Sequence, residues 1–184
     1  MKRSGFLSIS LLILANGLLS QPVYMTRIGT ASFVSNAPLE IIKAESNEVH
    51  GAIDLDENEF AFTIDNKSFK GFNSALQQEH FYENYMETQL YPVSSFKGKI
   101  IEKIDVNNAE EQMVRAKGIL DIHGVSQERI IKGTVQITEN KMQLNASFTV
   151  LLEDHQIKIP KVVNQKIAES IEVAINAELL REIK

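Results

Sequence analysis

The chain has 184 residues, of which 43% are hydrophobic and 23% are charged, and it contains neither Cys nor Trp. This composition excludes collagen-like, low-complexity and wholly disordered chains, and the length suits a single domain. The absence of Cys excludes disulfides, thiolate metal sites and a cysteine nucleophile. The formal net charge of -5 argues against nucleic acid or an anionic membrane surface as the main partner.

The first twenty residues have the pattern of a secretory signal peptide. Lys2 and Arg3 precede the apolar stretch 6–15, and the small residue Ser20 follows it. The stretch is shorter than the roughly 20 residues that span a bilayer. We therefore predict a signal peptide over 1–20 and a periplasmic or secreted protein without a stable membrane anchor; an uncleaved anchor is the alternative. Cleavage removes two positive charges and no negative ones, which takes the net charge from -5 to about -7.

Alternation of polar and apolar residues with a period of two dominates the rest of the chain. This period is typical of strands with one buried face. Short polar links such as His123-Gly124 and Glu139-Asn140 separate the alternating runs and predict antiparallel hairpins. We predict about eight strands, near 30–36, 39–44, 48–54, 58–66, 93–103, 112–123, 128–139 and 142–152, with another at 170–180.

Two segments interrupt this pattern. The stretch 74–86 predicts a helix, because Ser74 and Gln77 have the spacing of a capping box. The stretch 160–170 predicts a helical turn around 163–168. The fold class is therefore all-β with a small helical insertion, in one domain over about 24–184.

Antiparallel strands in this number are expected to close into a barrel, since closure removes the unpaired edges of a sheet. A barrel of about eight strands is either filled by side chains or holds one small ligand. Small residues lie among large ones on the predicted inner face, and they are compatible with both cases. These small residues are Gly98, Ala116, Gly118, Gly133 and Ala146.

The polar residues predict no catalytic centre. The histidines, His50, His80, His123 and His155, lack the spacing of metal ligands, and we predict neither metal nor cofactor. The sequence has no nucleophile elbow, no glycine-rich phosphate loop and no basic patch interleaved with aromatics. We expect His123 in a tight turn, and we expect His80 either to pack in the core or to contact a ligand headgroup. The protein is therefore not expected to be an enzyme.

Three stretches in order resemble the YceI-like family, bacterial polyisoprenoid-binding proteins with a lipocalin-like barrel. The first is Glu79-His80-Phe81 on the predicted helix. The second is Tyr91-Pro92-Val93-Ser94-Ser95-Phe96, similar to the family's Tyr-Pro-x-x-x-Phe. The third is Gly118-Ile119-Leu120-Asp121-Ile122-His123-Gly124-Val125-Ser126, similar to Gly-x-Leu-x-x-His-Gly-x-Thr. Weaker similarity covers most of the remaining chain after the signal.

The resemblance implies a single antiparallel lipocalin-like barrel of about eight strands, with an apolar tunnel for an isoprenoid or another long-chain amphiphile. We expect a non-catalytic protein that binds an isoprenoid, quinone or fatty-acyl lipid. The alternative is a structural or interaction module of the cell envelope with a filled core. We expect the aromatic residues between 60 and 96 and Phe148 to form the cavity wall as a group. The predicted ligand-binding residues are Phe33, Phe62, His80, Phe81, Phe96, Leu120 and Phe148.

Overall fold

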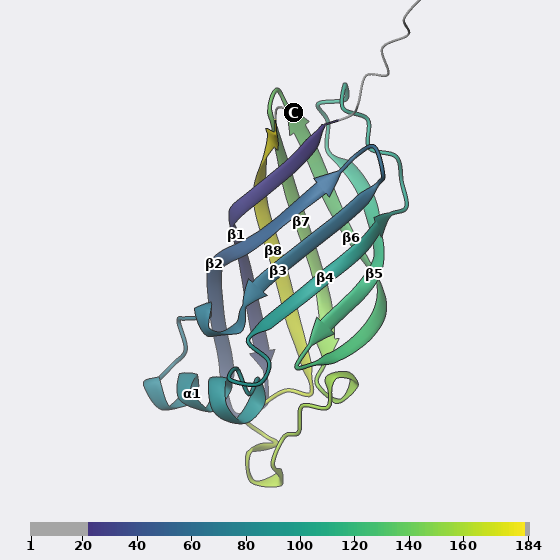
Figure 1. Ribbon diagram of the computed structural model, residues 1–184. Helices are drawn as coiled ribbons and strands as arrows, with labels where there is room; N and C mark the ends of the chain where they lie inside the picture. The colour runs from purple at the N-terminus through teal and green to yellow at the C-terminus, as the bar shows by residue number, and fades with distance from the viewer. Residues whose placement is uncertain (1–21, 183–184) are drawn as a thin grey trace, which may run out of the picture.

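The computed structural model describes residues 22–182, which fold into a closed antiparallel barrel (Figure 1). The strands follow the barrel in sequence order, and β1 closes it by pairing with β8. The predicted fold class is thereby confirmed. The strands are β1 (Val23–Asn36), β2 (Ile41–Asp54), β3 (Glu59–Asp65), β4 (Val93–Ile100), β5 (Gln112–Ile122), β6 (Val125–Thr138), β7 (Lys141–Leu151) and β8 (Ser170–Glu182). The predicted signal peptide lies outside the described residues.

The predicted strands 39–44 and 48–54 are wrong as separate elements, because both belong to β2. The register between β1 and β2 shifts on either side of Gly29, as in a β-bulge. Buried residues alternate through Ile42, Ala44 and Ser46 and resume one position out of phase at Val49, and the buried Ser46 hydroxyl lies 2.5 Å from that of Ser68. The bulge therefore breaks the alternation that the sequence shows, while the strand itself continues.

The helical insertion lies between β3 and β4. The helix α1 (Ala75–His80) begins after Ser74, whose hydroxyl accepts a hydrogen bond from the Gln77 amide at 3.2 Å, as the capping pattern predicts. It continues as the π-helical turn η2 (Phe81–Tyr85), in which the Met86 amide donates to the Phe81 carbonyl. No helix among residues 22–182 has the length and apolar character needed to cross a bilayer.

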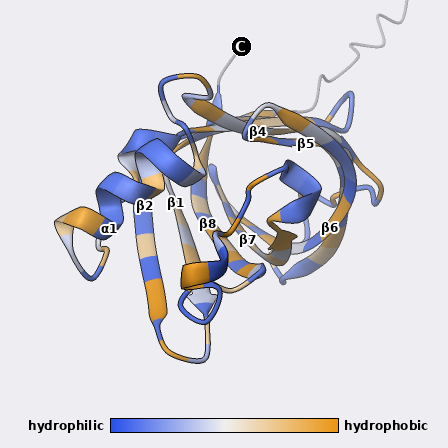
Figure 2. Cartoon of the chain, turned by 90° about the horizontal axis from the view of Figure 1, so that it is seen from below, coloured by the Kyte–Doolittle hydropathy of each residue, from blue (hydrophilic) through white to orange (hydrophobic). Residues whose placement is uncertain are grey.

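The segment between β7 and β8 contains two short turns. The first is η3 (Glu153–His155), and the second is η4 (Lys161–Val163), which follows Pro160. The helical turn predicted around 163–168 is present directly after η4, where the amides of Lys166 and Ile167 donate to the Val163 carbonyl at 2.8 and 3.2 Å. The segment crosses the end of the barrel that carries α1, as Figure 2 shows.

The other end of the barrel is solid. Side chains from all eight strands, the turn after β2 and the loop after β4 fill it, and Met142 and Leu179 are completely buried there. The cluster consists of Tyr24, Ile53, Leu55, Phe60, Ile100, Ile104, Val114, Val135, Ile137, Met142, Ala177 and Leu179. This core fixes the barrel from the end opposite to α1.

Two of the small residues have a different role from the one that the alternation suggests. Gly98 and Gly118 are paired across β4 and β5, and a Cβ on either would lie within 2.3 Å of a backbone carbonyl oxygen of the other strand. They allow close approach of two strands and do not line the interior cavity. Ala116, Gly133 and Ala146 do line it.

Candidate functional site

The half of the barrel beneath α1 is hollow. It encloses a cavity of about 540 Å³, within the roughly 300–1,000 Å³ typical of small-molecule sites. All eight strands contribute side chains to its wall, and α1, η2 and the segment between β7 and β8 form its rim. Members of the solid core form its floor, among them Phe60, Ile100 and Val114. The barrel is thus filled at one end and open to a ligand at the other.

All seven residues predicted to bind ligand line this cavity. Leu120 is buried, and the five phenylalanines of the set are half-buried because the hollow leaves part of each ring uncovered. His80 is exposed at the rim, which excludes the interpretation that it packs in the core. Direct contact of these residues with a ligand stays a prediction.

Four phenylalanine rings join the helical insertion to β1. Phe81 stacks on Phe33 with 5.3 Å between ring centroids, and it also contacts Phe69 and Phe72 at 5.8 and 5.1 Å. All four rings line the cavity. This phenylalanine cluster holds α1 and η2 against the barrel and at the same time forms the upper wall of the site.

A second group of rings lies deeper. The ring centroids of Phe60 and Phe96 are 4.7 Å apart, and those of Phe60 and Phe62 are 6.3 Å apart. Leu120 is paired with Phe96 across β4 and β5. The expectation that the aromatics as a group form the wall is wrong for two tyrosines. Tyr82 and Tyr91 do not line the cavity, because hydrogen bonds and ring contacts hold them outside it.

Polar groups of the cavity gather near the rim. Within residues 22–182, the side chains of His80, Tyr85 and Lys166 line the cavity without a hydrogen-bond or ion-pair partner. Burial raises the pKa of Tyr85 above its usual 10.0, so its hydroxyl stays protonated and can donate. The carboxylate of Glu40, in contrast, accepts a hydrogen bond from Gln77 at 3.0 Å.

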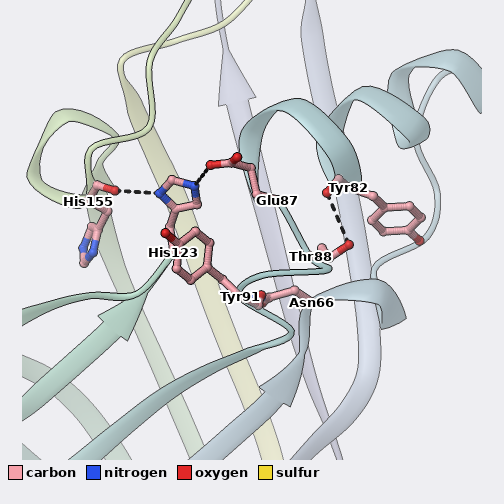
Figure 3. A network of polar contacts seen from close by, with 7 residues as sticks. All are labelled: Asn66, Tyr82, Glu87, Thr88, Tyr91, His123 and His155. Carbon is pink, nitrogen blue, oxygen red and sulfur yellow. Dashed lines mark hydrogen bonds and ion pairs between the residues drawn. The ribbon is translucent and has the colours of Figure 1, made fainter.

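A polar network beside the cavity ties three loops together (Figure 3). His123 lies in the tight turn that the sequence predicts, between β5 and β6. Its Nδ1 is 3.1 Å from the His155 carbonyl, and its Nε2 is 2.7 Å from the Glu87 carboxylate. Both partners are hydrogen-bond acceptors, a backbone carbonyl and a carboxylate. Tyr91 completes the network, with its ring centroid 4.5 Å from that of His123.

The network explains why the resemblance falls on Tyr91 and His123, although neither lines the cavity. Their role is to fix the rim, together with Glu87, whose backbone has the left-handed φ of 41°. His155 is completely buried beside them, and its Nδ1 donates to the Val125 carbonyl at 3.1 Å. The sequence gives no signal for Glu87, because its partner lies 36 positions away.

No group of three or more His, Cys, Asp or Glu side chains in the described part of the chain could hold a metal ion. Away from His80, Tyr85, Lys166 and Glu40, the polar side chains of the lining are hydroxyls and amides, several of them hydrogen-bonded, such as Ser94 to Asn66 at 2.8 Å. The geometry is that of a binding site for an apolar molecule with a polar end.

The fold and the cavity together define a lipocalin-type barrel. Residues 28–179 match the YceI-like domain, so the chain belongs to the YceI-like family. The resemblance found in the sequence is therefore confirmed. No curated protein sequence matches the chain.

Several solved structures share the fold. A polyisoprenoid-binding domain from Saccharophagus degradans is 16% identical, with a TM-score of 0.73 over 87% of this chain and 98% of its own. BcnA from Burkholderia cenocepacia is 13% identical, with a TM-score of 0.68 over 82% and 95%. A YceI protein from Campylobacter jejuni is 16% identical, with a TM-score of 0.56 over 100% and 94%. At these identities the likeness establishes the fold alone.

Proposed function

We propose that the protein binds a long-chain amphiphilic lipid in the hollow half of the barrel, without catalysing a reaction. An isoprenoid is the first candidate, and quinones and fatty-acyl lipids are the others. The observation that carries the proposal is a one-ended apolar cavity of about 540 Å³ whose unpartnered polar groups lie near the rim. Membership of the YceI-like family and the polyisoprenoid-binding domain among the similar structures support it.

The hydrophobic effect supplies the driving force for this binding. Each CH₂ group moved from water into the cavity contributes about 0.8 kcal/mol, so a five-carbon isoprene unit contributes up to roughly 4 kcal/mol. Association and ordering of the chain offset part of this gain. Several units are therefore enough for stable binding without a single hydrogen bond to the chain.

The rim suits the polar end of such a lipid. His80, Tyr85 and Lys166 offer hydrogen-bond donors that have no acceptor among residues 22–182. A headgroup with oxygen acceptors can accept from them while the chain extends toward Phe96 and the core below. The location proposed for this activity is the periplasm or the cell exterior, on the basis of the predicted signal peptide.

The alternative, a structural module with a filled core, fits only the solid half of the barrel, at the end opposite to α1. In the other half, Phe62, Phe96 and Phe148 remain half-buried although they face inward. A filled core would bury them. The cavity therefore favours binding over a purely structural role.

The test is native purification followed by organic extraction and mass spectrometry, then uptake of a polyprenol, a quinone and a fatty acid by the delipidated protein. Phe96→Trp places the chain's only tryptophan in the cavity wall, so its fluorescence is expected to change when the cavity is occupied. A protein that is always empty and takes up none of the three probes would contradict the proposal.

The control is Ile130→Trp, which places the tryptophan on an exposed side chain of β6, outside the cavity. Its fluorescence should be unaffected by the lipids. Equal changes in both variants would indicate nonspecific adsorption in place of cavity binding.

A further inference from the structure

The segment that crosses the open end of the barrel has an unusual charge for this acidic chain. We define the lysine loop as residues 156–168, which contain Lys158, Lys161 and Lys166 and no Asp or Glu. Within residues 22–182 none of the three ammonium groups has a hydrogen-bond or ion-pair partner. The loop is therefore a local positive patch in a chain of net charge -5.

The tip of the lysine loop is apolar as well as basic. Val162 lies next to Lys161 and is 88% exposed, more than any other large hydrophobic residue in the described part of the chain. The yellow-green loop also reaches farther from the barrel than α1 does (Figure 1). An exposed apolar residue with lysines nearby in the same loop is the pattern of a surface that enters a lipid interface.

The barrel holds the loop in place from two sides. The Gln165 carbonyl accepts from the Leu39 amide at 2.9 Å, and the Ala168 amide donates to the Ser35 hydroxyl at 2.9 Å. The inner side of the loop belongs to the cavity rim, through Val163 and Ile167. The loop thus leaves Lys158 and Lys161 exposed beside the opening, while Lys166 lines the cavity.

Two further exposed apolar residues continue this surface along the rim. Leu39 is 66% exposed and is bonded to the loop through its amide. Leu76 on α1 is 59% exposed and lines the cavity. The hydrogen bond between Glu40 and Gln77, their chain neighbours, brings these two leucines to the same side of the opening.

Acidic residues also lie near this end: Glu153 and Glu169 flank the lysine loop and are exposed, whereas others are paired or line a separate hollow. Glu79, Glu83 and Glu87 line that hollow, and Glu87 also contacts His123. Asp154 lies 3.8 Å from Arg129, and Glu40 is bonded by Gln77. Since charges beyond about 10 Å are screened at moderate ionic strength, the charges around the opening and not the net charge of the whole chain determine what this end attracts.

We propose that the lysine loop docks the open end of the barrel on the surface of an anionic phospholipid bilayer. Val162 enters the interface while Lys158 and Lys161 contact lipid phosphates. The mouth of the cavity then faces the bilayer, which is the source of its lipid ligand. The inference rests on the proposed function for its purpose, lipid exchange, but the docking is measurable without any ligand. It also qualifies the expectation, drawn from net charge, that an anionic membrane is not a main partner.

The test is flotation of the protein without its signal peptide with phosphatidylglycerol vesicles and with phosphatidylcholine vesicles, at low and at high salt. We expect binding to the anionic vesicles alone, weakened by salt. Lys158→Gln combined with Lys161→Gln should reduce the affinity about 25-fold, since each lysine near an anionic surface contributes about fivefold. Val162→Ser should reduce it without changing its salt dependence.

The matched control is Lys97→Gln combined with Lys132→Gln. It removes the same charge from exposed lysines of β4 and β6 that have no ion-pair partner among residues 22–182, and it should leave vesicle binding unchanged. Equal losses in both double variants, or a dimer that forms through the loop in sedimentation equilibrium, would overturn the docking.

Lipid uptake can be separated from docking. Neither loop lysine of the double variant lines the cavity, so uptake of a polyprenol from solution should persist. Failure of uptake in the unmodified protein with intact vesicle binding would contradict only the proposed function.

Discussion

Gly124 shows how one residue fixes the rim of the cavity. It has a φ of +69°, and a Cβ in its place would lie 2.4 Å from Cε1 of the Tyr91 ring. Gly124→Ala is therefore expected to destabilise the fold by about 2 kcal/mol or more, through the left-handed backbone and the displaced ring. Urea unfolding measures the loss.

Gly71 offers a matched control for this substitution. Its φ is +90°, but nothing lies within 4 Å of where its Cβ would stand. Gly71→Ala should lose only the backbone contribution, about 1 kcal/mol. If both variants lose the same stability, the contact between Gly124 and Tyr91 contributes nothing.

The turn at His123-Gly124 could be predicted from sequence, because positive φ values at two successive residues suit a tight hairpin turn with glycine second. The partners of His123 could not. Glu87 and Tyr91 approach it from a loop more than thirty residues away, and no periodicity or spacing encodes that contact.

At the scale of elements, the His123 network joins three segments that are not paired as strands: the turn between β5 and β6, the loop after η2, and η3. His123 and Glu87 are 2.7 Å apart, and the histidine side chain is only 10% exposed. In a double-mutant cycle of His123→Ala and Glu87→Ala, we expect a coupling energy of about 1 kcal/mol, reduced from that of a buried pair because Glu87 is partly in solvent. Thermal or urea unfolding of the four proteins gives this value.

His50 is the control, since it lies exposed on β2 and has no hydrogen-bond partner among residues 22–182. His50→Ala should change stability by less than about 0.5 kcal/mol. Additive losses in the cycle would show that the two side chains do not support each other.

Most strands could be predicted because one wet face and one dry face impose a period of two. The prediction divided one strand in two where that period is interrupted, at the bulge of β2 opposite Gly29. The helix predicted over 74–86 is present as α1 and η2, although the sequence does not distinguish the π-helical turn after His80 from continued α-helix. Such irregularities depend on how neighbouring elements pair and pack.

At the scale of the whole molecule, the two halves of the barrel should respond differently to truncation. Leu179 is completely buried in the solid half, and Leu179→Ala is expected to lose about 3 kcal/mol. Phe148 borders a space that already exists, so Phe148→Ala should lose less, about 1–2 kcal/mol, while reducing lipid uptake. Equal losses in urea unfolding would contradict the division into a solid and a hollow half.

Filling the hollow should separate binding from folding. Ala146 lines the cavity on β7, and a larger ring there occupies the space that a lipid chain needs. Ala146→Phe is expected to reduce polyprenol uptake at least about tenfold with stability changed by less than roughly 1 kcal/mol. Ser147→Phe is the control, because residue 147 is exposed on the outer face, and its uptake should remain unchanged.

All seven predicted ligand-binding residues reach the cavity wall: strand parity places five of them on the inner face, and His80 and Phe81 reach it from α1 and η2. Whether the interior is hollow could not be predicted. That property depends on the summed volume of side chains from eight strands, and Gly98 and Gly118, which looked like gaps in the interior, bring two strands together instead.

The solid core below Phe60, Ile100 and Val114 makes the cavity a blind pouch with a single opening. A chain inserted tail-first can descend only until it meets this floor, whatever its length. The depth of the cavity therefore sets a chain-length limit for the lipid. Affinity is expected to rise with each added carbon until the tail reaches the floor. Longer lipids of the same series gain no further affinity, because the excess chain stays in water.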